Sequence, residues 1–112
     1  MMALMAINNR DTIDSVAYEL NTLILQLYDH LDFDEEFEYD HMVMLQDKLN
    51  TYIWYIDSNQ YQDTYPEKEF SNFIINVFFM FEPTGLCKKF LENINLKLSE
   101  ANIYINYFIE QE

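Results

Sequence analysis

Seven of the twelve residues from 29 to 40 are acidic, and this cluster is the stretch best suited to chemistry. His30 lies inside the cluster and His41 follows it directly. Carboxylates and imidazoles together can bind a divalent cation, but the spacing lacks the ligand pattern and glycine of an EF-hand loop and the histidine pair of a helical zinc site. We therefore assign no metal ligand and no cofactor. The acids form a candidate docking patch: Asp29, Asp32, Asp34, Glu35, Glu36, Glu38 and Asp40.

Asp29 and His30 are the residues from which an acid–base enzyme would be built, because imidazole titrates near neutral pH and a carboxylate can orient it. A metal-dependent or acid–base enzyme using this acidic region is our alternative function. Neighbouring residues of a strand point to opposite faces, however, which makes Asp29 and His30 poor direct partners. We interpret His30 as a structural histidine and His41 as a residue on the surface of the following helix.

Cys87 is the only cysteine, so no disulfide can form within the chain, and a reducing compartment is the simpler setting. It precedes Lys88 and Lys89 near the start of a predicted helix, where the dipole and the lysines could lower its pKa. No resolving cysteine accompanies it, which favours a partly buried structural thiol. The chain also lacks a glycine-rich phosphate loop and a nucleophile elbow, and this absence of motifs favours a protein that is not an enzyme.

The net charge of -14, from 20 acids against 6 bases, would repel a phosphate backbone and argues against nucleic acid as a partner. Half of the 112 residues are hydrophobic, which suits a single domain over residues 1–112 with a loosely ordered start at 1–11. No apolar run approaches the length of a membrane span. We predict a cytoplasmic protein that does not bind membranes.

Hydrophobic periodicity predicts four strands and two helices. Alternating residues indicate strands at 13–20 and 23–31, joined by a tight turn at 21–22, and again at 73–82 and 103–109. Spacings of three and four indicate a helix from about 34 to 56 that ends near Asn59, and a second helix that Thr84 caps and Asn102 closes. The order ββαβαβ predicts an α+β fold, a four-stranded mixed sheet with both helices on one face.

That arrangement would leave the second face of the sheet without a helix. Such a face exposes more apolar surface than a soluble monomer usually does. We expect a homodimer or another protein to cover it, unless the N-terminal segment or the link at 60–68 folds over it. The candidate interface residues are Tyr18, Tyr28, Phe78, Met80, Tyr104 and Phe108.

Motifs spread over the chain from Ile13 onward carry a family resemblance. They are the strand end Tyr28-Asp29-His30-Leu31, the helix residues Leu45-Gln46-Asp47-Lys48-Leu49-Asn50 with Tyr52, Ile56 with Ser58, Tyr65-Pro66, the strand Val77-Phe78-Phe79 to Glu82-Pro83, and Phe90-Leu91. In these residues the chain resembles a family of small, mostly bacterial proteins of unknown function. Phe33 stands where that family usually has a tryptophan, and the resemblance supplies no catalytic residue.

These observations favour a small, acidic, non-enzymatic domain that binds a protein or regulates one. Its partner would be a second copy or a basic protein, as for an immunity-type protein that neutralises a basic partner.

Overall fold

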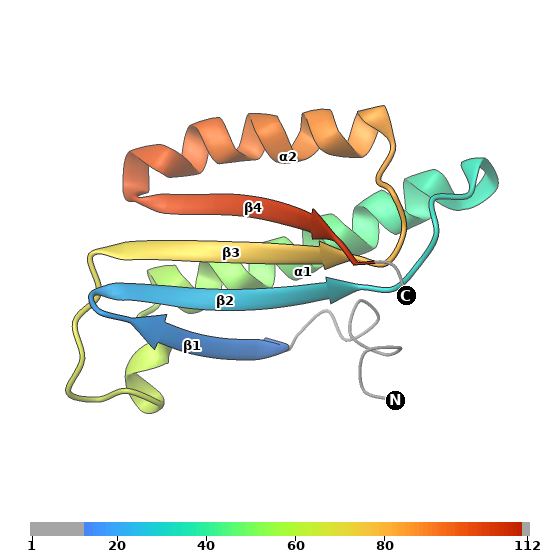
Figure 1. The fold of residues 1–112 in the computed structure, drawn as a ribbon. Helices are drawn as coiled ribbons and strands as arrows, with labels where there is room; N and C mark the ends of the chain where they lie inside the picture. The colour runs from blue at the N-terminus through green and yellow to red at the C-terminus, as the bar shows by residue number, and fades with distance from the viewer. Residues whose placement is uncertain (1–12, 111–112) are drawn as a thin grey trace.

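The computed structural model describes residues 13–110, and the predicted loose start at 1–11 lies outside them (Figure 1). The main elements are β1 (Ser15–Glu19), β2 (Thr22–Asp29), α1 (Glu38–Asp57), β3 (Asn72–Phe79), α2 (Gly85–Leu98) and β4 (Ile103–Ile109). Three short 3-10 turns flank the helices: η2 (Glu35–Phe37), η3 (Gln60–Asp63) and η4 (Ser99–Ala101).

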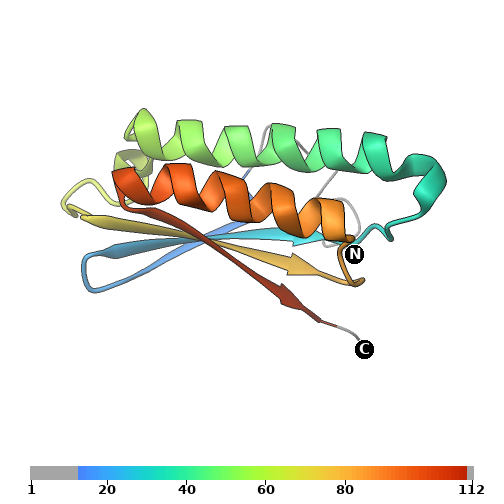
Figure 2. The same cartoon turned by 90° about the horizontal axis from the view of Figure 1, so that it is seen from above.

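The four strands form one sheet in the order β1-β2-β3-β4. β1 and β2 are antiparallel neighbours, whereas β2, β3 and β4 are parallel because a helix connects each pair. Figure 2 shows α1 and α2 on the same face of this sheet. The predicted α+β fold, with its mixed sheet and its helices on one face, is confirmed.

The core lies between the helices and one face of the sheet. Alternate residues of β2 and β3 point into it, and Leu25 and Ile75, which are direct neighbours across the two strands, are both fully buried. From α1, Leu45, Leu49 and Tyr52 cover these side chains and are at most 1% exposed. Burying one such leucine stabilises the fold by about 1.5–3 kcal/mol. Because this burial requires only that apolar residues share one face of an element, hydrophobic periodicity alone was sufficient to predict these elements.

Two asparagines end the helices, as predicted. Asn59 follows α1 with a φ of 61° and Asn102 follows α2 with a φ of 62°, both in the left-handed region that asparagine tolerates. At the start of α2, the Thr84 hydroxyl accepts a hydrogen bond from the Cys87 backbone N–H at 3.2 Å. α1 begins later than predicted, because the acidic residues of η2 form a separate 3-10 turn before it.

The turn between β1 and β2 lies one residue earlier than predicted. Glu19 pairs with Thr22, so the two-residue loop is Leu20 and Asn21, not residues 21–22. Leu20 has a φ of 55° and is 87% exposed. A leucine in this left-handed conformation is strained by about 1–2 kcal/mol, since its Cβ approaches a carbonyl oxygen.

Neither helix among the described residues is long and apolar enough to cross a membrane.

Candidate functional site

The acidic cluster does not form one surface, because its first member is buried. Asp29 ends β2, points toward the helices and is 1% exposed, so including it in the docking patch was wrong. Its Oδ1 accepts a hydrogen bond from the Leu31 N–H at 3.1 Å, and its Oδ2 lies 2.6 Å from His41 Nε2. The carboxylate therefore anchors the end of β2 to the first turn of α1.

His41 is the partner of Asp29 and is only 3% exposed, so placing it on the helix surface was wrong. Its Nδ1 lies 3.1 Å from the Asp32 carbonyl oxygen, which can only accept, so Nδ1 carries a hydrogen. The other ring nitrogen, Nε2, faces the Asp29 carboxylate. The Phe33 ring stacks on the imidazole with centroids 4.1 Å apart and closes the pair off from solvent.

His30 takes no part in this pair. It is half-buried and lies just beyond the end of β2. Its Nδ1 has no hydrogen-bond partner among the described residues. The Asp29 and His30 arrangement of the alternative enzyme is therefore not formed. The part of the chain that the structure describes also holds no group of three or more acidic, histidine or cysteine side chains suited to a metal ion.

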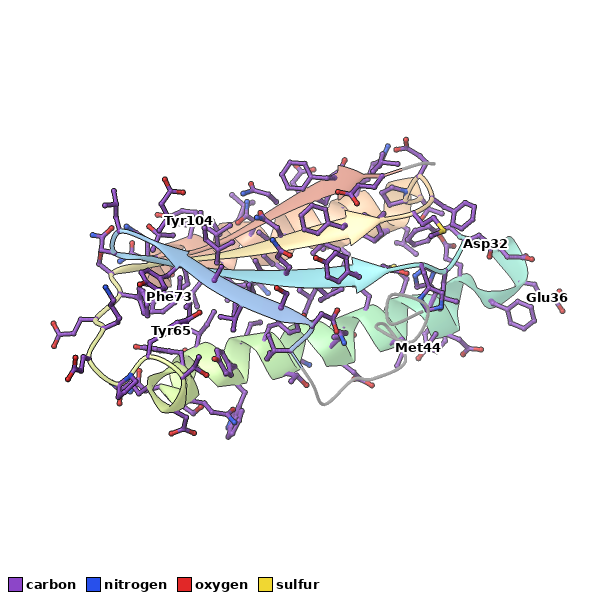
Figure 3. The ribbon with its side chains drawn as sticks, turned by 60° about the horizontal axis from the view of Figure 1, so that its bottom comes forward. Asp32, Glu36, Met44, Tyr65, Phe73 and Tyr104 are labelled. Atoms are coloured by element: carbon purple, nitrogen blue, oxygen red, sulfur yellow. The ribbon has the colours of Figure 1, made fainter. Side chains whose placement is uncertain are left out.

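The rest of the acidic cluster faces outward. Asp32, Asp34, Glu36 and Asp40 are exposed, Glu38 is half-buried, and the side chain of Glu35 lies outside what the structure describes. Figure 3 shows Asp32 and Glu36 at the end of the molecule where α1 begins, far from Tyr65 and Phe73 at the other end. Asp34 caps the start of η2, since its carboxylate accepts a hydrogen bond from the Glu36 N–H at 2.9 Å.

Cys87 is not a reactive thiol. It is fully buried, and its pKa is raised to about 12, chiefly by burial and to a smaller extent by the negative charges of Asp29 and Glu38. The lowering that the helix start and the neighbouring lysines suggested does not occur, because desolvation of the thiolate outweighs it. Lys88 pairs with Glu82 at 2.6 Å on the surface instead.

A second buried polar cluster joins β1, β2 and α1. Lys48 is fully buried, and its Nζ lies 2.7 Å from Asp14 Oδ1. The Tyr52 hydroxyl donates to the Gln26 carbonyl and accepts from the Asp14 N–H, and burial raises its pKa strongly. Sequence periodicity places Lys48 on the polar side of the helix. Only the position of Asp14 beside α1 explains why Lys48 is buried.

The sheet face opposite the helices carries no helix among the described residues (Figure 2). Figure 1 looks onto this open face, with α1 behind the strands. Register places three rows of side chains across β2, β3 and β4. We name them the aliphatic row (Ile24, Ile74 and Tyr104), the amide row (Gln26, Asn76 and Asn106) and the aromatic row (Tyr28, Phe78 and Phe108).

The aromatic row is a continuous ring stack. Phe78 lies between Tyr28 and Phe108, with centroids 5.4 Å away on each side and ring planes inclined by 23°. Because the stack runs across the strands, ring edges and not ring faces point outward. Phe108 is 46% exposed, and Tyr104 of the aliphatic row is 38% exposed. Met80, which is 36% exposed, follows the row at the end of β3.

The middle of the open face carries no charge. The amide row separates two apolar rows, and the Asn106 amide donates to the Asn76 side-chain oxygen at 3.5 Å. Glu19 and Glu110 lie only at the margins of the face. In a chain with a net charge of -14, an uncharged face bordered by acids is where a contact requires the least desolvation of charge.

Tyr18 does not belong to the open face, and its assignment to the interface was wrong. It pairs with Leu23, and directly opposite residues share a face, so Tyr18 lies on the helix side. There its ring packs edge-on against Tyr65 at 5.0 Å. The link at 60–68 lies on that side too, since Tyr61 is buried in the core, so the link does not cover the open face. The N-terminal segment, the other predicted cover, lies outside the described residues.

No curated protein and no solved structure matches the chain significantly. The model of a family of unknown function, DUF6572, matches residues 5–111. The chain therefore belongs to this family of unknown function.

Proposed function

We propose that the protein is a non-enzymatic protein-binding domain that acts as a homodimer through the open face. The observation that carries this proposal is the uncharged face itself, with one apolar row on each side of an amide row and no helix of residues 13–110 over it (Figure 2). Contiguous apolar surface of this kind marks a contact site more often than bare solvent-facing surface.

The size of the open face suits a stable dimer. The four strands are five to eight residues long, and at about 4.8 Å between strands and about 3.3 Å per residue they cover about 440 Å² in projection. Side-chain relief makes the accessible area larger than the projection, which brings it toward the roughly 800 Å² that each partner buries in a typical stable complex.

A second copy suits this face better than a basic protein does. A basic partner would have to place cations on a surface whose rows offer amides, two tyrosine hydroxyls and hydrocarbon but no carboxylate. Asparagine and glutamine each carry both a donor and an acceptor, so an amide row can pair with an identical row. The charge that would oppose association of two acidic copies lies away from the contact.

Light scattering on the purified chain tests the proposal. We expect a particle of twice the 13.6 kDa chain mass at micromolar concentration, and Ile74→Glu to give the single-chain mass with an unchanged circular dichroism spectrum. Leu96→Glu is the matched control, because Leu96 is 70% exposed on α2, and it should leave the dimer intact. A wild-type chain that remains monomeric at all concentrations would refute the homodimer.

A basic partner remains the second candidate, favoured by the exposed acids at the start of α1. Asp32, Asp34, Glu36 and Asp40 face solvent, and none of them forms an ion pair with a lysine or arginine within residues 13–110. A pull-down from the native extract at low and high salt tests this role, with a variant in which all four acids are amides as the control. Recovery of the chain alone at both salt concentrations would exclude it.

The alternative enzyme has less support. Asp29 and His41 are the only acid–imidazole pair in the described part of the chain, and both are buried beneath Phe33. Binding a second copy requires none of these residues.

A further inference from the structure

The outer edge of β4 lacks a cover in its second half. Among the β4 residues that face the helices, Ile103 and Ile105 are 2% and 6% exposed, whereas Tyr107 and Ile109 are each 38% exposed. Figure 2 shows the reason, since β4 diverges from α2 toward its C-terminal end. β4 also contains no charged residue and no proline, which are the residues that commonly keep an edge strand from pairing.

The backbone of this half offers hydrogen-bonding groups to a further strand. The Ile105 N–H points outward, because it donates to the Asn95 side chain of α2 at 2.9 Å, whereas the Glu110 N–H points inward and donates to β3. These directions alternate along a strand, so the N–H and C=O groups of Tyr107 and Ile109 also point outward. Within residues 13–110 they have no hydrogen-bond partner.

We propose that this edge pairs antiparallel with the same edge of a second copy, about a two-fold axis at Phe108. Tyr107 then exchanges two hydrogen bonds with the partner's Ile109, and Ile109 with the partner's Tyr107, so that the free groups of both copies are satisfied. The contact goes beyond the proposed homodimer. An edge points along the plane of the sheet, so it stays accessible when the open face is covered.

Asn95 limits how far the pairing can extend toward the start of β4. An axis one residue earlier, at Tyr107, would set Ile109 opposite the partner's Ile105 and would require the Ile105 N–H. That group is already bound to Asn95. An axis at Phe108 leaves this bond intact.

Charge and apolar contact favour the same axis. With the axis at Phe108, the two Phe108 rings lie directly opposite each other and extend the aromatic row into the second copy. Glu110 then lies opposite the partner's Asn106. An axis one residue later, at Ile109, would instead set Glu110 against the partner's Phe108 and bring a charge onto an apolar ring.

An uncharged strand is the occupant that suits this edge. Helical spacing places Lys88 and Glu92 on the same side of α2 as Asn95, and Lys88 is already paired with Glu82 at 2.6 Å. These charges of mixed sign select neither a strongly acidic nor a strongly basic strand. β4 of a second copy is uncharged over its whole length and therefore places no charge beside them.

Light scattering over a range of protein concentrations tests the edge contact. The contact joins few residues, so it should be weaker than the open-face contact. We expect the two-chain mass at micromolar concentration and a rise toward the four-chain mass near millimolar. Ile109→Lys should weaken this second step about tenfold or more and leave the first unchanged, because an edge lysine resists pairing. Leu96→Lys is the matched control, since it adds the same charge at an exposed position of α2 and should keep both steps.

N-methylated peptides test the backbone pairing. A peptide of residues 103–110 should block the second step, because it can add to the edge as a strand. Methylation of its Asn106 and Phe108 nitrogens should leave the block intact, since those N–H groups point away from the contact. Methylation of its Tyr107 and Ile109 nitrogens should abolish the block.

The outcomes separate the edge contact from the open-face homodimer. A wild type that keeps the two-chain mass up to millimolar concentration, or a second step that survives Ile109→Lys, would overturn the edge contact and leave the homodimer standing. Binding of the unmodified peptide without a second step would overturn the second copy as the occupant and assign the edge to a strand of another protein. A wild type that is monomeric at micromolar concentration and pairs only near millimolar, with Ile109→Lys preventing it, would refute the open-face homodimer and support the edge contact. Circular dichroism of each variant confirms that it is folded.

Discussion

The buried pair of Asp29 and His41 allows a sharp prediction about stability. Replacing His41 by leucine keeps an apolar side chain beneath Phe33 but leaves the Asp29 carboxylate with only its hydrogen bond from Leu31. Replacing Asp29 by asparagine has a different effect. The new amide oxygen can still accept from Leu31, and the amide nitrogen can donate to a neutral His41, whose Nδ1 continues to donate to the Asp32 carbonyl.

The magnitudes of the two effects should differ several-fold. An unpaired buried charge costs about 3–5 kcal/mol, a large share of the roughly 5–15 kcal/mol that stabilises a typical domain. Exchanging a charged for a neutral hydrogen bond with all groups satisfied costs about 1 kcal/mol. His41→Leu should therefore be severely destabilising and Asp29→Asn mildly so, although both remove the same carboxylate–imidazole contact.

Urea denaturation at one fixed protein concentration measures both. With a slope of about 1–3 kcal/mol per molar urea, His41→Leu should lower the midpoint by about 2 M and Asp29→Asn by well under 1 M. Lys88→Ala is the matched control, because Lys88 pairs with Glu82 at the same 2.6 Å but on the surface, with side chains 42% and 58% exposed. It should leave the midpoint unchanged. Equal shifts for His41→Leu and Lys88→Ala would show that burial does not set the strength of this pair.

Three further predictions concern single residues. Cys87 should react with iodoacetamide at pH 8 only after unfolding. Its folded pKa of about 12 exceeds the unfolded value of 9.0, so the stability that it contributes is present below pH 9 and lost as the pH rises through about 12. Cys87→Ala should therefore reduce the fall in the free energy of unfolding at alkaline pH, as measured by denaturation. Leu20→Gly should raise the free energy of unfolding by about 1 kcal/mol by relieving a left-handed leucine, and a lower melting temperature would contradict this. The Asn95 side chain accepts a hydrogen bond from the Ile105 N–H at 2.9 Å and so caps the edge of β4. Asn95→Ala should therefore destabilise the fold by about 1 kcal/mol and promote aggregation, measured by light scattering over time. A soluble variant with an unchanged urea midpoint would show that the cap is dispensable.

Local patterns in the sequence were sufficient to predict the fold. Hydrophobic residues alternate along each strand and recur at spacings of three and four along each helix, because one face of each element must enter a common core. Residues such as Leu25, Leu49 and Ile75 show this pattern within their own elements. The stops at Asn59 and Asn102 and the cap at Thr84 are equally local, since each acts on backbone groups within a few residues.

The polar and interface residues that were predicted wrongly depend on contacts between distant parts of the chain. His41 looks like a surface residue until the end of β2 places Asp29 beside it, twelve positions away. Lys48 is buried because Asp14, far earlier in the chain, lies against α1. Tyr18 changes face because the hairpin register sets it opposite Leu23.

The sequence by itself determined the order of the elements, the side of each that enters the core and the acidity of the chain, because these follow from residue type and local period. Only the tertiary structure decided which polar side chains meet, that Cys87 has a raised pKa, and that the open face is three ordered rows with an uncharged centre. The physical reason is that hydrophobic burial needs only a face, whereas an ion pair, a desolvated thiol or a ring stack needs specific atoms from separate segments at contact distance.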